Sequence, residues 1–328
     1  MKNKSVLITG GMGFIGPTLI NKLKDNNKVV VVDRLDYGLP PLIEDSINTD
    51  FEFIEADLSE IGPIHQRIDG GEFDVIIHMA SISLIPICEN QPDFAFKSNT
   101  ISPLNIFKRI HNKAIFLNFS TSAVYSPANN NHNEDDHYDP IDIYGWTKKH
   151  TEDLAKFYAK KSDFPVINIR LANAAGYGET NLKLFGEILS QVTKGEKDIY
   201  LGNLTPKRDY VHIDDIAWAV ENLIDSNYVK PGHFESFNIG TGHEPISVLE
   251  VFNLVNAAYG NKFTLIQDEK RKRAADQERE LLAINISKLK SVLPNYKPMQ
   301  IHDWIEDIAL EPGLRIGDSF IEDIYFKG

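Results

Sequence analysis

The stretch that decides the fold is Val6-Leu7-Ile8-Thr9-Gly10-Gly11-Met12-Gly13-Phe14-Ile15-Gly16, near the start of the chain. A short apolar run leads directly into glycines spaced three apart, at Gly10, Gly13 and Gly16. This spacing supplies a tight turn, a backbone that can approach a pyrophosphate, and close packing of a helix on the strand. Because the first N–H groups of a helix attract anions, residues 10–16 are predicted to bind the phosphates of a cofactor.

A second apolar run, residues 28–33, ends in Asp33, 17 residues after Gly16. A carboxylate at this position accepts hydrogen bonds from an adenosine ribose and repels a 2′-phosphate, so it favours NAD over NADP. Arg34 acts in the opposite sense, because an arginine can hold a 2′-phosphate. The alternative is that the glycines form an ordinary turn and that Asp33 is an unrelated capping residue. This alternative does not explain why the glycines and Asp33 occur together at these positions.

Short apolar runs alternate with helical patterns through the first 170 residues. Strands are expected at residues 5–9, 28–33, 51–55, 74–79, 114–120 and 166–171, and helices at 13–26, 93–112 and 143–161. Most of these strands are continuously apolar, which is typical of a parallel sheet covered by helices on both faces. The pattern predicts an α/β fold with a doubly wound parallel sheet over residues 1–172, to which a later segment near 211–241 returns. Residues 173–328 are expected to form mainly a smaller substrate-binding lobe and a C-terminal tail.

The composition excludes several classes of function. The chain has 328 residues, of which 42% are hydrophobic and 25% charged, as in an ordinary globular protein. Its formal net charge of −13 repels nucleic acids and anionic membranes at long range, so neither is an expected partner. No apolar run approaches the length of a membrane span, and the single cysteine, Cys88, excludes an intramolecular disulfide. We expect a cytoplasmic protein without a metal site.

A tyrosine and a lysine lie four residues apart in Tyr144-Gly145-Trp146-Thr147-Lys148. On a helix the two side chains share one face. A free tyrosine is a poor base at neutral pH, but a nearby ammonium group lowers its pKa by stabilising the phenolate. A phenolate can remove a proton from a sugar hydroxyl while a hydride leaves the adjacent carbon. The pair alone is a weak signal, because the same spacing occurs by chance in many helices.

The combination of motifs is far more specific than any one of them. In chain order they are GGMGFIG at 10–16, Asp33, Asp57-Leu58, His78-Met79-Ala80, Ser120-Thr121-Ser122 and the segment 144–148. Over about residues 4–309 the sequence resembles the extended short-chain dehydrogenases/reductases, specifically the NAD-dependent nucleotide-sugar epimerase/dehydratase family. The resemblance implies a Rossmann-type domain with NAD as cofactor and a nucleotide-diphosphate sugar as substrate. It also implies a homodimer built on the helices near 93–112 and 143–161.

The resemblance also implies where the cofactor lies. Asp57 and Leu58 would lie against the adenine ring, and the segment after the fourth strand would pass beside the diphosphate and ribose. Asn99 looks like the family's asparagine on the long helix beneath the site. The expected cofactor contacts are Gly10, Gly13, Phe14, Ile15, Gly16, Asp33, Arg34, Asp57, Leu58, Met79, Ala80, Ser81, Asn99, Tyr144 and Lys148.

The catalytic and substrate-binding roles follow from the same resemblance. Thr121 would hydrogen-bond the reacting sugar oxygen, Tyr144 would be the catalytic base, and Lys148 would hold the nicotinamide ribose. Arg208 and Arg273 would clamp the substrate diphosphate, which lets an acidic protein bind an anion. The alternatives are a surface salt bridge of Arg208 with Asp214 or Asp215, and a solvated face for Arg273 in the basic run 270–273. The expected substrate contacts are Ser83, Thr121, Ser122, Asn173, Arg208 and Arg273.

The two residues that directly follow Thr121 discriminate between the reactions of the family. Members that perform 4,6-dehydration typically carry an Asp–Glu pair there, whereas this chain has Ser122 and Ala123. An alanine cannot transfer a proton, so 4,6-dehydration is disfavoured. We expect a nucleotide-sugar epimerase that works through a transient keto-sugar. A nucleotide-sugar 4-dehydrogenase or ketoreductase is the main alternative, and a non-catalytic nucleotide-binding scaffold is a third.

Overall fold

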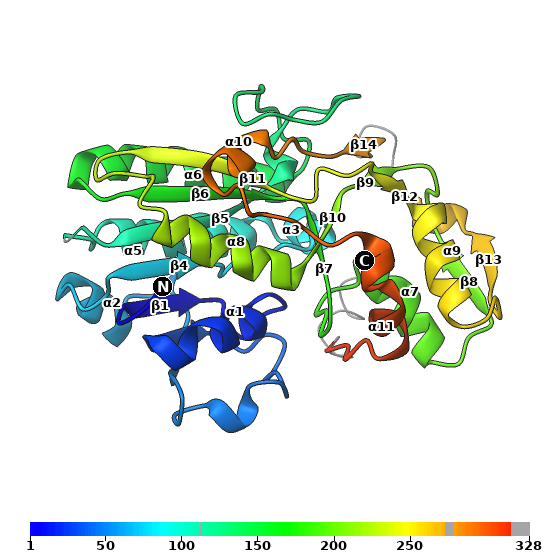
Figure 1. The fold of residues 1–328 in the computed structure, drawn as a ribbon, viewed down its shortest axis with the longest axis horizontal. Coiled ribbons are helices and arrows are strands. Elements are labelled where there is room, and N and C mark those ends of the chain that lie inside the picture. Colours follow the sequence, from blue (N-terminus) through cyan, green and yellow to red (C-terminus); the bar gives the residue numbers. More distant parts are fainter. Residues whose placement is uncertain (112, 273–277, 316–328) are drawn as a thin grey trace.

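The computed structural model describes residues 1–111, 113–272 and 278–315. Its centre is a seven-stranded parallel sheet in the order β11-β6-β5-β4-β1-β2-β3 (Figure 1). The strands are β1 (Ser5–Thr9), β2 (Lys28–Asp33), β3 (Glu52–Glu55), β4 (Val75–His78), β5 (Ile115–Thr121), β6 (Val166–Leu171) and β11 (Phe234–Ile239). The expected doubly wound sheet is therefore confirmed, and the returning segment supplies its edge strand β11 beside β6.

Helices cover both faces of the sheet, which explains why the central strands β1, β2 and β4 are almost continuously apolar. Val6 and Ile8 of β1 face one core with α1 (Gly16–Leu23) and α8 (Ile213–Asp225), and Leu7 between them faces the other. The second core is completed by α2 (Pro63–Asp69), α5 (Ser102–Phe107) and α6 (Ile143–Ser162). The chain winds outward from β1 in both directions, so the carboxyl ends of β1 and β4 form the crevice where ligands bind in such sheets.

The helix expected at 93–112 is divided into three pieces. It consists of α4 (Pro92–Phe96), a π-helical turn, η3 (Lys97–Ile101), and α5. The proline at 103 has no N–H, so it cannot continue the helical hydrogen-bond ladder to the carbonyl oxygen of Asn99. The Thr151 hydroxyl of α6 donates to that oxygen instead, at 2.7 Å. The helix expected at 13–26 likewise begins later, at Gly16, and ends in the 3-10 turn η1 (Lys24–Asn26).

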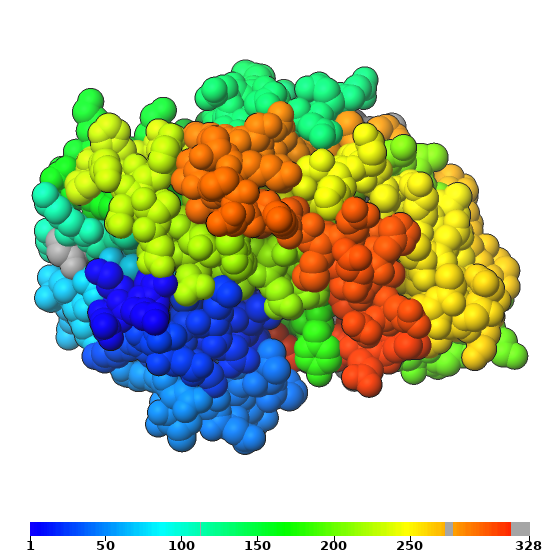
Figure 2. All heavy atoms as spheres, in the orientation of Figure 1, coloured from blue at the N-terminus to red at the C-terminus, as the bar shows by residue number. Residues whose placement is uncertain are grey.

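The second lobe is built from small sheets and helices beside the carboxyl ends of the parallel strands, on the right in Figures 1 and 2. Its strand pairs are β7 with β10, β8 with β13, and β9 with both β12 and β14. The strands are β7 (Asn173–Ala175), β8 (Asp198–Leu201), β9 (Lys207–Arg208), β10 (Tyr210–His212), β12 (Ile246–Ser247), β13 (Thr264–Gln267) and β14 (Leu281–Leu282). Its main helices are α7 (Leu184–Thr193), α9 (Val248–Ala258) and α11 (Ile305–Leu310).

The remaining elements are short. They are α3 (Ile85–Asn90), α10 (Ser287–Val292) and the 3-10 turns η2 (Glu44–Ser46), η4 (Ser122–Val124), η5 (Glu269–Arg271) and η6 (Ile301–Asp303). In the described ranges, none of the helices combines the length and the hydropathy that a membrane span needs.

Candidate active site

A cavity of about 420 Å³ lies at the carboxyl ends of the parallel strands, between the sheet and the second lobe. It brings together nearly all of the residues singled out in the sequence. Those that line it are Gly10, Gly13, Phe14, Ile15, Gly16, Asp33, Arg34, Asp57, Leu58, Met79, Ala80, Ser81, Ser83, Thr121, Ser122, Tyr144, Lys148, Asn173 and Arg208. Asn99 is not among the lining residues, and Arg273 lies outside the described part of the chain.

At two positions the glycine loop has no room for a side chain. Gly10 has a φ of +71°, and a Cβ there would come within 2.5 Å of the Ala80 backbone nitrogen. A Cβ on Gly16 would lie 2.0 Å from the Gly11 carbonyl oxygen. Both positions therefore require glycine, and they leave the start of α1 open toward the cavity. A cradle that only glycines can form fits a cofactor whose phosphates approach the backbone.

Asp33 ends β2 and turns its carboxylate toward this loop. Its two oxygens accept hydrogen bonds from the backbone N–H groups of Met12 and Leu35, each at 2.9 Å. Burial raises the pKa of Asp33 above its ordinary value, and these hydrogen bonds oppose that shift. Arg34 is held by acidic neighbours, at 2.6 Å from Asp36 and 3.5 Å from Asp57. The residues thus fit an adenosine ribose at Asp33.

The tyrosine and the lysine occupy the first turns of α6, deep in the cavity. Burial raises the pKa of Tyr144, and a hydrogen bond with the Thr121 side chain opposes this rise. The ammonium group of Lys148 lies 6.0 Å from the centre of the Tyr144 ring and donates to the Phe119 carbonyl oxygen at 2.8 Å. Burial lowers the pKa of Lys148 to about 8. The protonation state of Tyr144 therefore depends on the groups placed around its hydroxyl.

Asn99 lies beneath the cavity, where it joins two elements that form the cavity wall. Its side-chain amide donates to the Ile82 carbonyl oxygen at 2.9 Å and to the Thr147 hydroxyl at 3.0 Å. Its side-chain oxygen accepts from the Ile82 N–H at 2.7 Å. It thus ties the loop after β4 to α6, and the π-helical turn places it there.

The opposite end of the cavity carries arginines from the second lobe. Arg208 pairs with Glu278 at 2.9 Å and also donates to the Arg279 carbonyl oxygen at 2.7 Å. Arg271 lines the same end and pairs with Glu187 of α7 at 2.6 Å. Asn173, at the start of β7, lies on the wall as well. This end therefore holds the cations Arg208 and Arg271 and the amide of Asn173, from three separate segments, around one space.

Among the charged residues of the cavity that sequence reasoning missed are Asp142 and Arg279, which form an ion pair at 3.1 Å. Asp142 could have been found, since an aspartate two residues before Tyr144 is a typical cap of the helix that carries it. Its side chain accepts from the Gly145 N–H at 2.7 Å. Arg279 had no local signal, because its partner lies 137 residues away.

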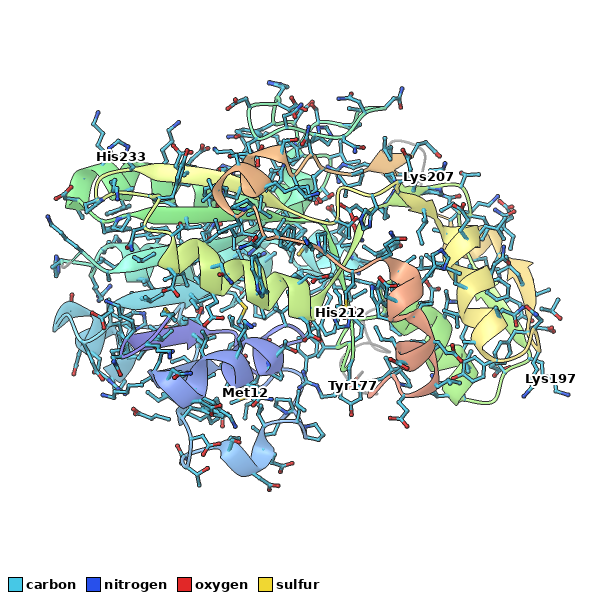
Figure 3. All side chains as sticks on the ribbon, viewed as in Figure 1. Met12, Tyr177, Lys197, Lys207, His212 and His233 are labelled. Atoms are coloured by element: carbon cyan, nitrogen blue, oxygen red, sulfur yellow. The ribbon has the colours of Figure 1, made fainter. Side chains whose placement is uncertain are left out.

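The last described residues run back from the second lobe to the glycine loop. Arg315 donates to the carbonyl oxygens of Met12 and Gly13 at 3.0 and 2.9 Å. Tyr177, labelled in Figure 3, packs so closely on Gly313 that a Cβ at Gly313 would be 2.1 Å from its ring. This segment therefore braces the glycine loop from the second lobe. Within the described ranges, no group of His, Cys, Asp and Glu could hold a metal ion.

Comparisons with known proteins agree with this geometry. The model of the NAD dependent epimerase/dehydratase family matches residues 6–240. A putative UDP-glucose 4-epimerase of Methanocaldococcus jannaschii is 27% identical over 319 residues, covering 94% of this chain and 96% of the relative. A dTDP-4-dehydro-6-deoxyglucose reductase of Escherichia coli is 28% identical, covering 80% of this chain and 84% of the relative.

A solved structure shares the fold. The UDP-glucuronic acid 4-epimerase of Bacillus cereus, in complex with UDP-glucuronic acid and NAD, has a TM-score of 0.81 at 24% identity, covering 94% of this chain and 98% of its own. The match of the family model to more than half of the chain, together with the glycine loop and the tyrosine–lysine pair in one cavity, identifies the protein as a member of the NAD-dependent epimerase/dehydratase family.

Proposed function

We propose that the protein is an NAD-dependent nucleotide-sugar epimerase that works through a transient keto-sugar. The observation that carries the proposal is the cavity wall itself. Thr121, Tyr144 and Lys148 line one space, while Ser122 and Ala123 stand where dehydration would need acids. A site with one base and no further acid at these positions suits removal and return of a hydride at a single carbon.

The glycine loop and Asp33 are proposed to hold NAD. The loop leaves the N-terminus of α1 open to the cofactor diphosphate, and the Asp33 carboxylate repels a 2′-phosphate. Asp57 and Leu58 would contact the adenine, and Met79, Ala80 and Ser81 the diphosphate and ribose. Bound NAD would supply a reversible hydride acceptor next to the sugar.

The chemistry assigned to this chain is a proton transfer. Tyr144 would take the proton of the sugar hydroxyl and later return it, and Thr121 would orient the same oxygen. The Lys148 cation, 6.0 Å from the centre of the Tyr144 ring, would stabilise the phenolate form. Lys148 would also hold the nicotinamide ribose.

Arg208 and Asn173 are proposed to bind the substrate diphosphate. Guanidinium groups form paired, charge-assisted hydrogen bonds with phosphate oxygens. The position of Arg208 on the cavity wall supports this assignment, and the diphosphate would share or replace its present partner Glu278. Arg273 stays a prediction from the sequence.

A homodimer is also proposed, through α6 and the helices α4 and α5. Phe157 and Ile101 of this face are 58% and 41% exposed, which leaves apolar surface for a second copy. Two such helices from each subunit would form a four-helix bundle on a two-fold axis. Light scattering at micromolar concentration tests this, and a monomer would contradict it.

The test of the function follows reduced nicotinamide by absorbance during turnover. A panel of UDP-, GDP-, CDP- and dTDP-sugars, analysed by mass spectrometry, first identifies a substrate. An epimerase accumulates product without net reduction of the cofactor, whereas a dehydrogenase or ketoreductase changes the cofactor in proportion to product.

A matched pair of variants on α6 tests the base. Tyr144→Phe should lower kcat by about 10²–10⁴-fold, because it removes the hydroxyl that takes the proton. Tyr158→Phe, on the same helix but stacked on Phe107 rather than in the cavity, should keep native turnover. Near-native turnover of Tyr144→Phe would refute the assignment.

A further inference from the structure

A buried ion pair inside the cavity has no part in the chemistry assigned above. Asp142 and Arg279 both line the cavity, and their side chains are 9% and 6% exposed. Asp142 directly precedes α6, whereas Arg279 comes from the segment before β14. A buried pair is costly to form, because both charges leave water. A pair that carries this cost at the cavity wall is therefore expected to have a role there.

The pair joins the two elements that carry the catalytic side chains. The Asp142 carboxylate caps α6 by accepting from the Gly145 N–H, one residue after Tyr144. Arg279 donates to the Ala123 carbonyl oxygen at 2.9 Å, two residues after Thr121. The two elements touch, since a Cβ on Gly145 would lie 2.7 Å from the same Ala123 oxygen. Arg279 therefore bridges the turn after Thr121 and the start of the Tyr144 helix.

The charge of Asp142 also acts on the tyrosine. Burial is the main cause that raises the pKa of Tyr144, and the Asp142 carboxylate adds to it, which further disfavours the phenolate. Three other groups face Tyr144: the Thr121 hydroxyl from β5, the Cys88 thiol from α3 and the Lys148 ammonium from α6. The Cys88 thiol is neutral at physiological pH, because burial raises its pKa to about 12. The Glu89 carboxylate of α3 accepts from the Ile143 N–H nearby, at 2.8 Å.

We propose that Arg279 is a positioning residue that neutralises Asp142, so that the carboxylate can cap the catalytic helix without preventing Tyr144 from acting as a base. The inference rests on the proposed function of Tyr144. The inference gives Asp142 and Arg279 opposite electrostatic effects on the Tyr144 hydroxyl, in addition to the ion pair that they form with each other.

The test compares pH–rate profiles of the NAD-bound enzyme. Arg279→Gln leaves Asp142 uncompensated, so the apparent pKa that governs kcat should rise by about one pH unit, with about a tenfold loss of kcat below it. Asp142→Asn should shift the same pKa downward, because asparagine still caps a helix but carries no charge. The double variant should return the pKa close to the native value.

A direct titration separates this inference from the proposed function. The ultraviolet absorbance of the phenolate, taken as the difference between each protein and its Tyr144→Phe counterpart, should show the same opposite shifts without turnover. Arg67→Gln is the matched control, because Arg67 pairs with Glu52 and Glu72 outside the cavity and its loss should leave both profiles unchanged.

The possible outcomes are distinct. If both single variants lose activity with unshifted pKa values, the pair is merely structural and the inference is overturned. The inference is equally overturned if both shifts have the same sign. Native turnover of Tyr144→Phe would instead overturn the proposed function.

Discussion

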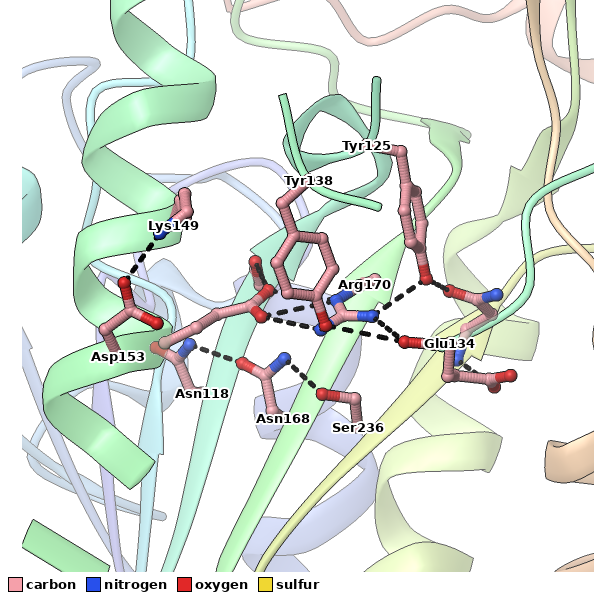
Figure 4. Close-up of polar contacts among 12 residues, drawn as sticks. Asn118, Tyr125, Glu134, Tyr138, Lys149, Asp153, Asn168, Arg170 and Ser236 are labelled. Atoms are coloured by element: carbon pink, nitrogen blue, oxygen red, sulfur yellow. Dashed lines mark hydrogen bonds and ion pairs between the residues drawn. The ribbon is translucent and has the colours of Figure 1, made fainter. Parts of the chain in front are cut away.

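The buried pair between Glu152 and Arg170 offers a sharp test of how α6 is held on the sheet. Their side chains are 5% and 1% exposed, and the guanidinium of Arg170, which is labelled in Figure 4, lies 2.8 Å from the Glu152 carboxylate. Glu152→Gln keeps the shape of the side chain but removes its charge. Arg170 would then be buried with neutral acceptors, among them the Tyr125 hydroxyl and the Glu134 carbonyl oxygen.

The magnitude follows from that burial. Removing one partner of a buried pair leaves an uncompensated charge and costs about 3–5 kcal/mol of unfolding free energy. We expect the lower end, about 3 kcal/mol, because the amide oxygen of glutamine still accepts a hydrogen bond. Denaturation by urea, followed by fluorescence and circular dichroism, measures this difference.

The same helix supplies the control. Lys149 and Asp153 are also 2.8 Å apart, but the Asp153 side chain is 61% exposed (Figure 4). Asp153→Asn should cost about 0.5 kcal/mol or less, because water screens a surface pair. If the two variants lost equal stability, the reasoning from burial would be refuted.

Three further predictions concern the cofactor and pH. Asp33→Asn should raise affinity for NADP relative to NAD about tenfold, measured by calorimetry, because it removes the charge that repels a 2′-phosphate; an unchanged ratio would contradict it. Arg315→Ala should speed NAD dissociation about tenfold in stopped-flow measurements, since the glycine loop loses two charge-assisted hydrogen bonds; an unchanged rate would show that the loop needs no brace. Burial lowers the pKa of His78 to about 3 from its usual 6.5, so the unfolded state binds more protons between these values. Between pH 6 and pH 5, the free energy of unfolding should therefore fall by about 1 kcal/mol more in the native protein than in His78→Asn. Equal pH slopes of the unfolding free energy in the two proteins would argue against a lowered pKa of His78.

The parts of the site that could be predicted are those set by neighbours in sequence. The glycine loop and Asp33 follow directly from strand ends, and a helix brings Tyr144 and Lys148 together without any tertiary information. The break at the π-helical turn was missed. Pro103 gave a signal for it, but the Thr151 hydroxyl that satisfies the freed carbonyl comes from another helix.

The long-range contacts had no such signal. Arg279 reaches Asp142, and Arg315 reaches Met12, across more than a hundred residues of chain. A basic residue in a charged segment is normally solvated, so its local sequence gives no reason to place it in a cavity. The positions of these arginines are determined by how the second lobe packs on the sheet.

The order in which the strands of the sheet occur in the sequence also limits how the protein can be divided into fragments. β11 is the edge strand beside β6, yet β7 to β10 of the second lobe precede it in the sequence. A fragment that stopped at residue 172 would leave β6 as the edge strand, with the backbone hydrogen-bonding groups that face β11 unpaired. Such a fragment would recruit other strands and aggregate, so the cofactor-binding half cannot be isolated by a single cut.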